Sequence, residues 1–210
     1  MLKLVDQSNN RRKVSSFSSE TKLSRVFFNR WIILTQRFDN SLNFDRNWQA
    51  YQYGFNDGRG EDGNFWLGLE KMHQLTYSGR YQLRFLLQRS FDDQWHEADY
   101  DLITIDSEAQ NYRWHFGLYS GDAGDALRYD NGRWNLQDME FSTCDHPGSL
   151  GPYCPCKYSS GWWYKDCMEA SLTASNYTDV NSYEWNPPGQ QPFFSPTCHL
   201  KASLMLIRML

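Results

Sequence analysis

The segment CKYSSGWWYKDC, residues 156–167, carries the most specific pattern in this chain of 210 residues. It places two tryptophans and two tyrosines between two cysteines. The surrounding residues 121–196 lack regular periodicity and are rich in Gly, Pro, Asp, Asn and Ser, as loops are. All five cysteines lie in the last third of the chain, which favours local disulfides and an oxidising compartment, although the odd number leaves at least one without an internal partner. They are Cys144, Cys154, Cys156, Cys167 and Cys198.

The composition predicts a folded domain. Aromatic residues make up 17% of the chain and charged residues 22%, with a formal net charge of −4. This many rings can bury enough area to offset the entropy of ordering, which excludes a charge-driven disordered chain. Basic residues are scattered, so nucleic acid is not an expected partner. No apolar stretch reaches the 18 or more residues of a membrane span, and the start of the chain contains no recognisable secretory signal.

Helical spacing appears twice. Phe44, Trp48, Tyr51 and Phe55 recur at intervals of three and four residues, which predicts an amphipathic helix ending at the glycines of positions 58 and 60. A second, shorter helix is expected over residues 69–75. Residues 1–24 have no sustained period and predict a flexible leader.

Strands are expected in the middle and at the end of the chain. The predicted antiparallel strands cover residues 80–89, 97–105 and 112–120, where apolar residues alternate or run together between polar turns. Residues 201–208 are short and apolar, which predicts a buried strand returning to the same sheet. Because helices and strands are segregated along the chain, the predicted class is α+β.

Four segments, taken in order, resemble the fibrinogen-related domain, the C-terminal globular module of fibrinogen, ficolins, tachylectins, tenascins and angiopoietins. They are WIILTQRFDNSLNFDRNWQAYQYGF (31–55), GNFWLGLEKMHQLT (63–76), YSGDAGDALRYDNG (119–132) followed by FSTCD (141–145), and CKYSSGWWYKDC (156–167). The resemblance implies a central antiparallel sheet, packed helices, and a loop-rich ligand-binding region held by calcium and a disulfide. The family's small N-terminal subdomain is missing, so residues 25–210 are expected to form the domain without it.

The resemblance also implies one disulfide. Cys154 and Cys167 stand where the family has the disulfide of its ligand pocket, so a Cys154–Cys167 bridge is expected. Closing so short a loop stabilises the fold by about 3 kcal/mol in the chain-entropy description. The remaining cysteines have no counterpart in the family. A second bridge between Cys144 and Cys156 would leave Cys198 unpaired or bonded to another chain.

A zinc site is the alternative interpretation of the extra cysteines, because His146 and His199 lie close to Cys144 and Cys198 in the sequence. Cysteine thiolates and histidines are the usual ligands of structural zinc. However, Cys154 and Cys156 are separated by one residue rather than two. Disulfide pairing is therefore the preferred interpretation.

The resemblance implies that calcium is held by an Asp-x-Asp pair after Phe-Ser-Thr. Here Asp145 fills the first position, but Pro147 stands at the second. Calcium needs six to eight oxygen ligands, and proline removes a carboxylate from the set. Calcium binding is therefore expected to be weakened or lost. Alternatively, Asp145 only begins a turn before Pro147-Gly148.

The ligand pocket implied by the resemblance lies near the Cys154–Cys167 bridge, with backbone amides around Tyr153 and Cys154. Tyr164 supplies one aromatic wall, and the other candidate walls are Tyr177, Tyr183 and Trp185. Apolar rings hold an acetyl methyl group, while a few polar groups hold its oxygen. Trp162 and Trp163 are expected to be packing residues. Asn176-Tyr177-Thr178 is an N-glycosylation sequon in this region.

The leading hypothesis is an extracellular, secreted, non-catalytic recognition module of the innate-immune lectin kind, binding acetylated sugars or other glycans. The alternative is a protein-binding ligand domain in adhesion or receptor signalling, as in angiopoietins and tenascins, with a cell-surface or matrix protein as partner. A third interpretation is a degenerate, truncated fragment. An enzyme is disfavoured because no catalytic motif is present. The resemblance implies that a full-length form can oligomerise, as family members usually do through collagen-like or coiled-coil segments, and the leader has neither pattern.

Overall fold

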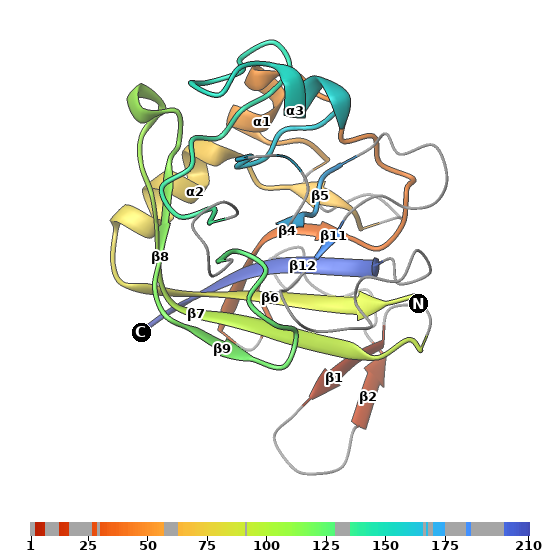
Figure 1. Ribbon diagram of the computed structural model, residues 1–210. Helices are drawn as coiled ribbons and strands as arrows, with labels where there is room; N and C mark the ends of the chain where they lie inside the picture. Colours follow the sequence, from red (N-terminus) through yellow and green to blue (C-terminus); the bar gives the residue numbers. More distant parts are fainter. Residues whose placement is uncertain are drawn as a thin grey trace.

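The computed structural model describes residues 3–6, 13–16, 27–28, 30–56, 63–90, 92–128, 135–165, 167, 170–174, 184–185 and 200–210. An eight-stranded antiparallel sheet runs through the described chain, and the α-helices gather on one side of the molecule, at the top of Figure 1. The predicted α+β class is confirmed.

The main sheet has the strand order β3-β4-β12-β6-β7-β8, with β5 paired to β4 and β9 paired to β7. The C-terminal strand β12 therefore lies in the middle, between β4 and β6. The apolar run near the end of the chain predicts a buried strand in this sheet, though not its place in the strand order. Its register places Met205 opposite Phe85 of β6 and opposite Thr35 of β4. The strands are β3 (Phe27–Phe28), β4 (Trp31–Arg37), β5 (Phe65–Trp66), β6 (Tyr81–Arg89), β7 (Trp95–Ile105), β8 (Trp114–Phe116), β9 (Tyr119–Gly121) and β12 (Leu200–Met209).

The predicted strand over residues 112–120 is two strands in the structure. β8 and β9 both pair with β7, and Gly117-Leu118 separates them. The backbone N–H of Gly117 donates to the Leu102 carbonyl, while that of Leu118 donates to the Asp101 carboxylate. Side-chain competition of this kind interrupts a strand without ending the sheet.

Helix α1 (Trp48–Tyr53) is shorter than the spacing from Phe44 predicts. Asn47 is its N-cap and accepts a hydrogen bond from the Ala50 N–H, so the chain before it is not helical. Phe44 is nevertheless fully buried, and its carbonyl accepts from the Tyr51 hydroxyl at 2.7 Å. The helix ends at Gly54, whose φ of 94° favours glycine.

The remaining elements are short. Helix α2 (Leu69–Tyr77) extends the predicted second helix by two residues, and a 3₁₀ turn covers Glu108–Gln110. Helix α3 (Tyr153–Lys157) is one turn long, and β10 (Ala170–Ser171) pairs with β11 (Glu184–Trp185). None of the described helices is long and apolar enough to span a membrane.

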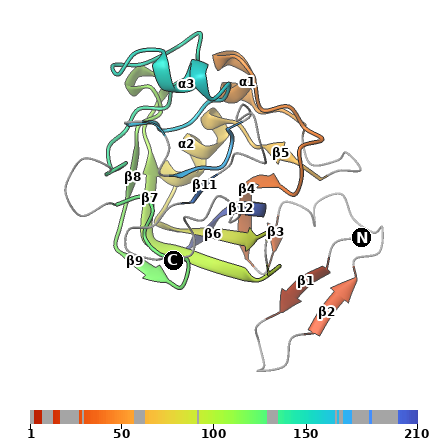
Figure 2. The ribbon, with the colours of Figure 1, turned by 45° about the vertical axis from the view of Figure 1, so that its right-hand side comes forward.

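Within the region predicted as a leader, β1 (Lys3–Asp6) and β2 (Lys13–Ser16) pair antiparallel as a separate two-stranded sheet. Figures 1 and 2 both draw this hairpin at the opposite end of the molecule from α1 and α3. The helices α1 and α3 therefore lie away from this hairpin.

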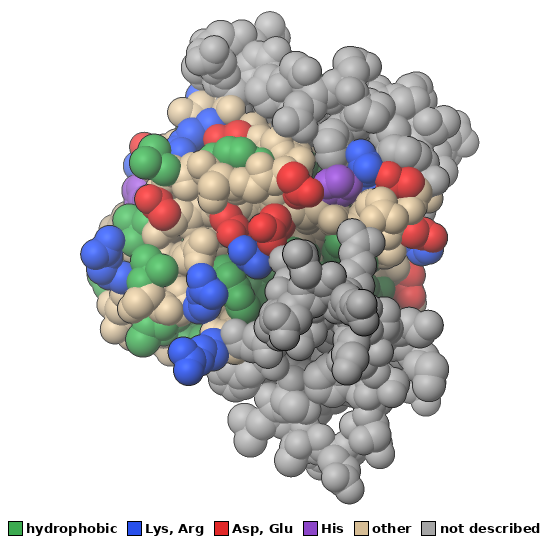
Figure 3. All heavy atoms as spheres, turned by 90° about the horizontal axis from the view of Figure 1, so that it is seen from below, with side chains coloured by type: hydrophobic (Ala, Val, Ile, Leu, Met, Phe, Trp, Pro, Cys, Tyr) green, Lys and Arg blue, Asp and Glu red, His purple; other side chains and the backbone are tan. Residues whose placement is uncertain are grey.

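The main core lies between the helices and one face of the sheet. In β6 every second residue is buried, which turns Tyr81, Leu83, Phe85 and Leu87 to that face. A smaller apolar cluster on the sheet includes Trp31, Leu204 and Leu206. On the face seen from below, acidic and basic side chains lie next to one another, with hydrophobic side chains between them (Figure 3).

Candidate functional site

Two disulfides anchor the loop-rich region to helix α3. One joins Cys154 to Cys167, and the other joins Cys144 to Cys156. Because Cys154 and Cys156 share one helical turn, that turn is linked covalently to two loops. All four cysteines are therefore removed from the zinc hypothesis. Among the described residues no three His, Cys, Asp or Glu side chains come together as a metal site, and Cys198 and His199 lie outside those residues.

The GWWY segment crosses the core beside these disulfides. Trp162 and Ser142 exchange two backbone hydrogen bonds, at 3.0 and 3.1 Å. Trp162 and Trp163 are fully buried, as expected for packing residues. The Trp163 indole N–H donates to the Tyr112 carbonyl at 2.8 Å. The segment therefore holds a fixed position between β8 and the disulfide-linked loops.

Tyr164 follows the two tryptophans and lies at the wall of a pocket. It is 4% exposed, and its hydroxyl lies 2.5 Å from Ser160 Oγ. Burial raises the pKa of Tyr164 to about 12. The ring is therefore a neutral wall with its polar end already hydrogen-bonded.

The pocket has a volume of about 210 Å³. Its lining combines apolar and charged side chains, and most of it comes from the loop between β9 and α3. The lining residues are Arg113, Asp138, Met139, Glu140, Ser142, Pro147, Gly148, Ser149, Leu150 and Tyr164. Leu150 is 58% exposed, so it presents an apolar side chain to solvent beside the opening.

Glu140 links two parts of the pocket lining through its carboxylate. Its carboxylate accepts from Arg113 Nη2 at 3.1 Å and from the Ser149 N–H at 2.9 Å. Partial burial acts to raise the pKa of Glu140, but the hydrogen bonds from Ser149 and Arg113 outweigh this and lower it. Glu140 therefore stays ionised. It joins Arg113, directly before β8, to the segment that carries Ser149 and Leu150.

The remaining charge at the pocket comes from Asp138, whose side chain is more than half exposed. Its Oδ1 lies 2.6 Å from Nδ1 of His115, and Nε2 of the same ring lies 3.0 Å from Asp106 Oδ2. Burial lowers the pKa of His115, but the hydrogen bonds to Asp106 and Asp138 outweigh it and leave the pKa raised. The pocket thus has two carboxylates and one guanidinium among its lining groups.

Four of the six predicted ligand-binding residues are described, and of these four Tyr164 is the one that lines this pocket. Trp185 is 2% exposed and packs on Phe85 at 4.9 Å between ring centroids, so it belongs to the core. Cys154 is half-buried in its disulfide, and Tyr153 is 67% exposed on α3 without lining the pocket. Tyr177, Tyr183 and the sequon residue Asn176 lie outside the described residues.

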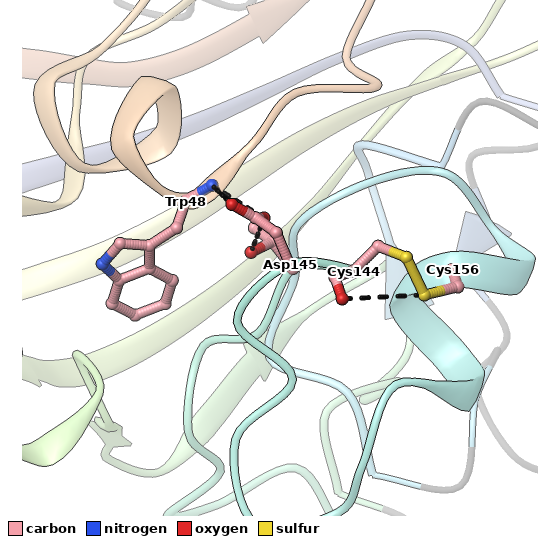
Figure 4. Close-up of a disulfide and its surroundings, with 5 residues drawn as sticks. Trp48, Cys144, Asp145 and Cys156 are labelled. Atoms are coloured by element: carbon pink, nitrogen blue, oxygen red, sulfur yellow. Dashed lines mark hydrogen bonds between the residues drawn. A yellow bond between two sulfur atoms is a disulfide. The ribbon is translucent and has the colours of Figure 1, made fainter.

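Asp145, the expected calcium ligand, is engaged by the protein itself. Its carboxylate accepts from the backbone N–H of Trp48, with its two oxygens at 3.0 and 3.2 Å, and from Thr143 Oγ1 at 2.7 Å. Trp48 is the first residue of α1, so Asp145 satisfies a backbone donor at the start of that helix. Figure 4 shows this contact beside the Cys144–Cys156 bridge.

The residues that sequence reasoning missed are Arg113, Asp138, Glu140 and Leu150. Each stands in a strand end or loop with no periodicity, and single charges in loops are usually solvated. Only the fold brings β8 next to the segment of residues 138–150. Nearness in sequence to the recognised FSTCD segment is the one signal that points to Glu140.

The sequence matches the family model described as fibrinogen beta and gamma chains, C-terminal globular domain, over residues 14–191. The chain is 37% identical to protein scabrous of Drosophila melanogaster over 161 residues, covering 74% of this chain and 19% of scabrous. It is 36% identical to angiopoietin-4 of Homo sapiens over 204 residues, covering 91% of this chain and 38% of that protein. The chain thus spans well under half the length of these relatives.

Solved structures give the same assignment. The fibrinogen-like globe domain of human ANGPTL6 superposes with a TM-score of 0.69 at 32% identity, covering 86% of this chain and 78% of that chain. Lamprey fibrin D-dimer complexed with the peptide Gly-His-Arg-Pro-amide superposes with a TM-score of 0.71 at 28% identity, covering 85% of this chain and 61% of that chain. The family model that matches is not that of an enzyme family. The chain belongs to the family of fibrinogen C-terminal globular domains.

Proposed function

We propose that this chain is a non-catalytic, extracellular recognition module whose pocket beside Tyr164 binds a protein ligand. The main support for this proposal is the pocket itself, which is formed by loops and supported by two disulfides within a fibrinogen-type fold. Disulfides persist in oxidising, extracellular settings, which supports secretion. A related fold, lamprey fibrin D-dimer, has been solved with a bound peptide, which supports a peptide-like ligand for this one.

The size and lining of the pocket favour one protein side chain or chain end. About 210 Å³ is below the roughly 300–1,000 Å³ of pockets that enclose drug-sized molecules. Met139, Pro147 and Leu150 offer apolar contact, while Asp138 and Glu140 offer carboxylate acceptors. Leu150, exposed beside the pocket, adds apolar area that a bound partner would bury.

An acetylated sugar is the second candidate. The buried Tyr164 ring with apolar neighbours and nearby carboxylates suits an acetyl group, whose methyl needs apolar contact and whose amide N–H needs an acceptor. Among the described residues, Tyr164 supplies the one aromatic ring in the lining of this pocket, while apolar and charged side chains make up most of the rest. The protein ligand is therefore preferred.

One binding experiment separates the two candidates. The full chain is immobilised and screened against purified cell-surface and matrix ectodomains and against an N-acetylated glycan array. Leu150→Asp places a charge beside the pocket, and Leu118→Asp makes the same change at a 74% exposed position outside the pocket lining. We expect saturable binding to an ectodomain that weakens about tenfold or more in Leu150→Asp and is unchanged in Leu118→Asp.

The outcomes that contradict the proposal are equally specific. Glycan-array binding that free N-acetylglucosamine competes away, without any ectodomain binding, would favour the lectin candidate. Equal losses in the two aspartate variants would remove the pocket from recognition. Absence of binding to either set would count against both candidates.

A further inference from the structure

Residues 143–146 form a tight turn directly before residues 147–150, which line the pocket. The backbone N–H of Thr143 donates to the His146 carbonyl at 3.0 Å, and the His146 N–H donates to the Thr143 carbonyl at 3.1 Å. Cys144 and Asp145 therefore stand at the tip of a tight turn. Reciprocal backbone bonds of this kind fix the turn without any external ligand.

Each residue at the tip makes a long-range link. Cys144 is bonded covalently to Cys156 of α3. The Asp145 carboxylate accepts from the Trp48 N–H at the first turn of α1, and Thr143 Oγ1 donates to the same carboxylate. In Figure 4 Asp145 reaches toward Trp48 while Cys144 extends toward Cys156. The turn thus connects two helices that are about a hundred residues apart in sequence.

His146 adds a third link. Its imidazole stacks on the Trp48 indole, with centroids 3.9 Å apart and planes at 22°. Its Nε2 lies 2.9 Å from Asn111 Oδ1, beside the end of the 3₁₀ turn. The ring is therefore held by an aromatic face on one side and a polar partner at its edge.

The donor set at this turn does not fit calcium. Calcium takes six to eight oxygen ligands, several of them carboxylates, at 2.3–2.6 Å. Asp145 already accepts from two protein donors, and Pro147 stands where the family pattern has a second carboxylate. In the part of the chain that the structure describes, no third acidic, histidine or cysteine side chain completes a cluster.

We propose that the segment of residues 143–146 is a metal-independent clamp. The Cys144–Cys156 bridge and the Asp145–Trp48 contact hold this segment in place without a calcium ion. Pro147, Gly148, Ser149 and Leu150 follow the clamp directly and line the pocket. The clamp therefore sets the pocket's wall, and the pocket keeps its shape when calcium is removed. The inference builds on the pocket of the proposed function, but its test uses no ligand, so the two can fail separately.

Thermal unfolding of the full chain in millimolar calcium and in EDTA tests the metal independence. A site saturated by calcium would raise the melting temperature by several degrees through linkage. We expect the same melting temperature in both conditions. Asp145→Ala should lower it by the same amount in both, whereas Asp45→Ala, an exposed aspartate three residues before Trp48, should not lower it. A calcium-dependent rise that Asp145→Ala abolishes would overturn the proposal.

Amide hydrogen exchange tests the covalent half of the clamp. In the Cys144→Ser/Cys156→Ser double variant, we expect residues 143–150 to exchange faster, with and without calcium, while β6 and β7 keep their protection. Ser149 N–H, which donates to Glu140, reports directly on the pocket wall. Unchanged exchange across residues 143–150 would show that the bridge does not hold the segment.

Discussion

The indole rings of Trp114 and Trp163 stack face to face, with centroids 4.3 Å apart and planes within 3°. Both side chains are fully buried, and they join β8 to the GWWY segment. Each indole N–H has a carbonyl partner, at Leu136 for Trp114 and at Tyr112 for Trp163. This pair therefore couples the sheet to the loop region that carries the pocket.

Trp163→Phe should destabilise the domain by about 2–3 kcal/mol, because it leaves a void beside Trp114 and an unsatisfied Tyr112 carbonyl. Chemical denaturation followed by circular dichroism measures the free energy of unfolding. Trp95→Phe makes the same change at a half-buried position of β7 and should cost less than about 1 kcal/mol. Equal costs at the two positions would contradict a special role for the stacked pair.

Gly161→Ala should destabilise the domain by about 1–3 kcal/mol through overpacking. A Cβ at position 161 would lie 2.7 Å from a ring carbon of Phe141 and 2.8 Å from one of Tyr51, and both rings are fully buried. Gly79→Ala is the matched control, since its Cβ would meet only the flexible end of Met209 and the Tyr81 ring at ordinary or slightly short distances. A change in melting temperature that is equal in the two variants would argue against the close approach at Gly161.

Strands marked by alternation or by a continuous apolar run could be predicted to within a few residues. The expected strand of residues 80–89 is Tyr81–Arg89, and the expected strand of residues 201–208 is Leu200–Met209. Both alternation and length are local properties that burial in a sheet imposes. The order of strands, with the last one between β4 and β6, depends on contacts across the whole chain and has no local signal.

The surroundings of a candidate site residue come from distant segments, which a local sequence pattern does not encode. Trp185 is an aromatic residue in a loop-rich region, which favours a ligand contact, yet β10 pairs with its strand and Phe85 packs against its ring. Conversely, the role of Asp145 at the start of α1 depends on a contact spanning 97 residues. The two disulfides join residues only 12 and 13 positions apart. The resemblance implied Cys154–Cys167, and Cys144–Cys156 was a suggested second bridge.

Arg37→Met should destabilise the domain by about 3 kcal/mol. The Arg37 side chain is 4% exposed, and its Nη1 donates to the carbonyls of Ala174 at 2.8 Å and Leu172 at 3.3 Å. Methionine keeps much of the apolar packing but removes charged hydrogen bonds, each worth about 1.5–3 kcal/mol. Denaturant titration measures the loss. Arg46→Met, at an exposed arginine, should change stability by less than about 0.5 kcal/mol, and a loss similar to that of Arg37→Met would contradict the prediction.

The contribution of His115 to stability should decrease as the pH rises. An imidazole donates to two carboxylates at once only when both nitrogens carry protons, so the contacts with Asp106 and Asp138 favour the charged ring. The pKa of His115 is accordingly raised in the folded state, although burial acts against it. A raised folded-state pKa gives stability that is fully present below the unfolded pKa of about 6.5 and is lost as the pH rises through the folded value.

The measurement is the difference in free energy of unfolding between the wild type and His115→Asn across the range from acidic to alkaline pH. This difference should be largest below about pH 6 and should shrink at higher pH, because the neutral ring can no longer donate to both carboxylates. Asp138→Asn removes one of the two charges and should show a weaker dependence on pH than the wild type. Two-bond ¹H–¹⁵N spectra give the titration of His115 directly, and a folded-state pKa at or below the ordinary value would contradict the charged bridge.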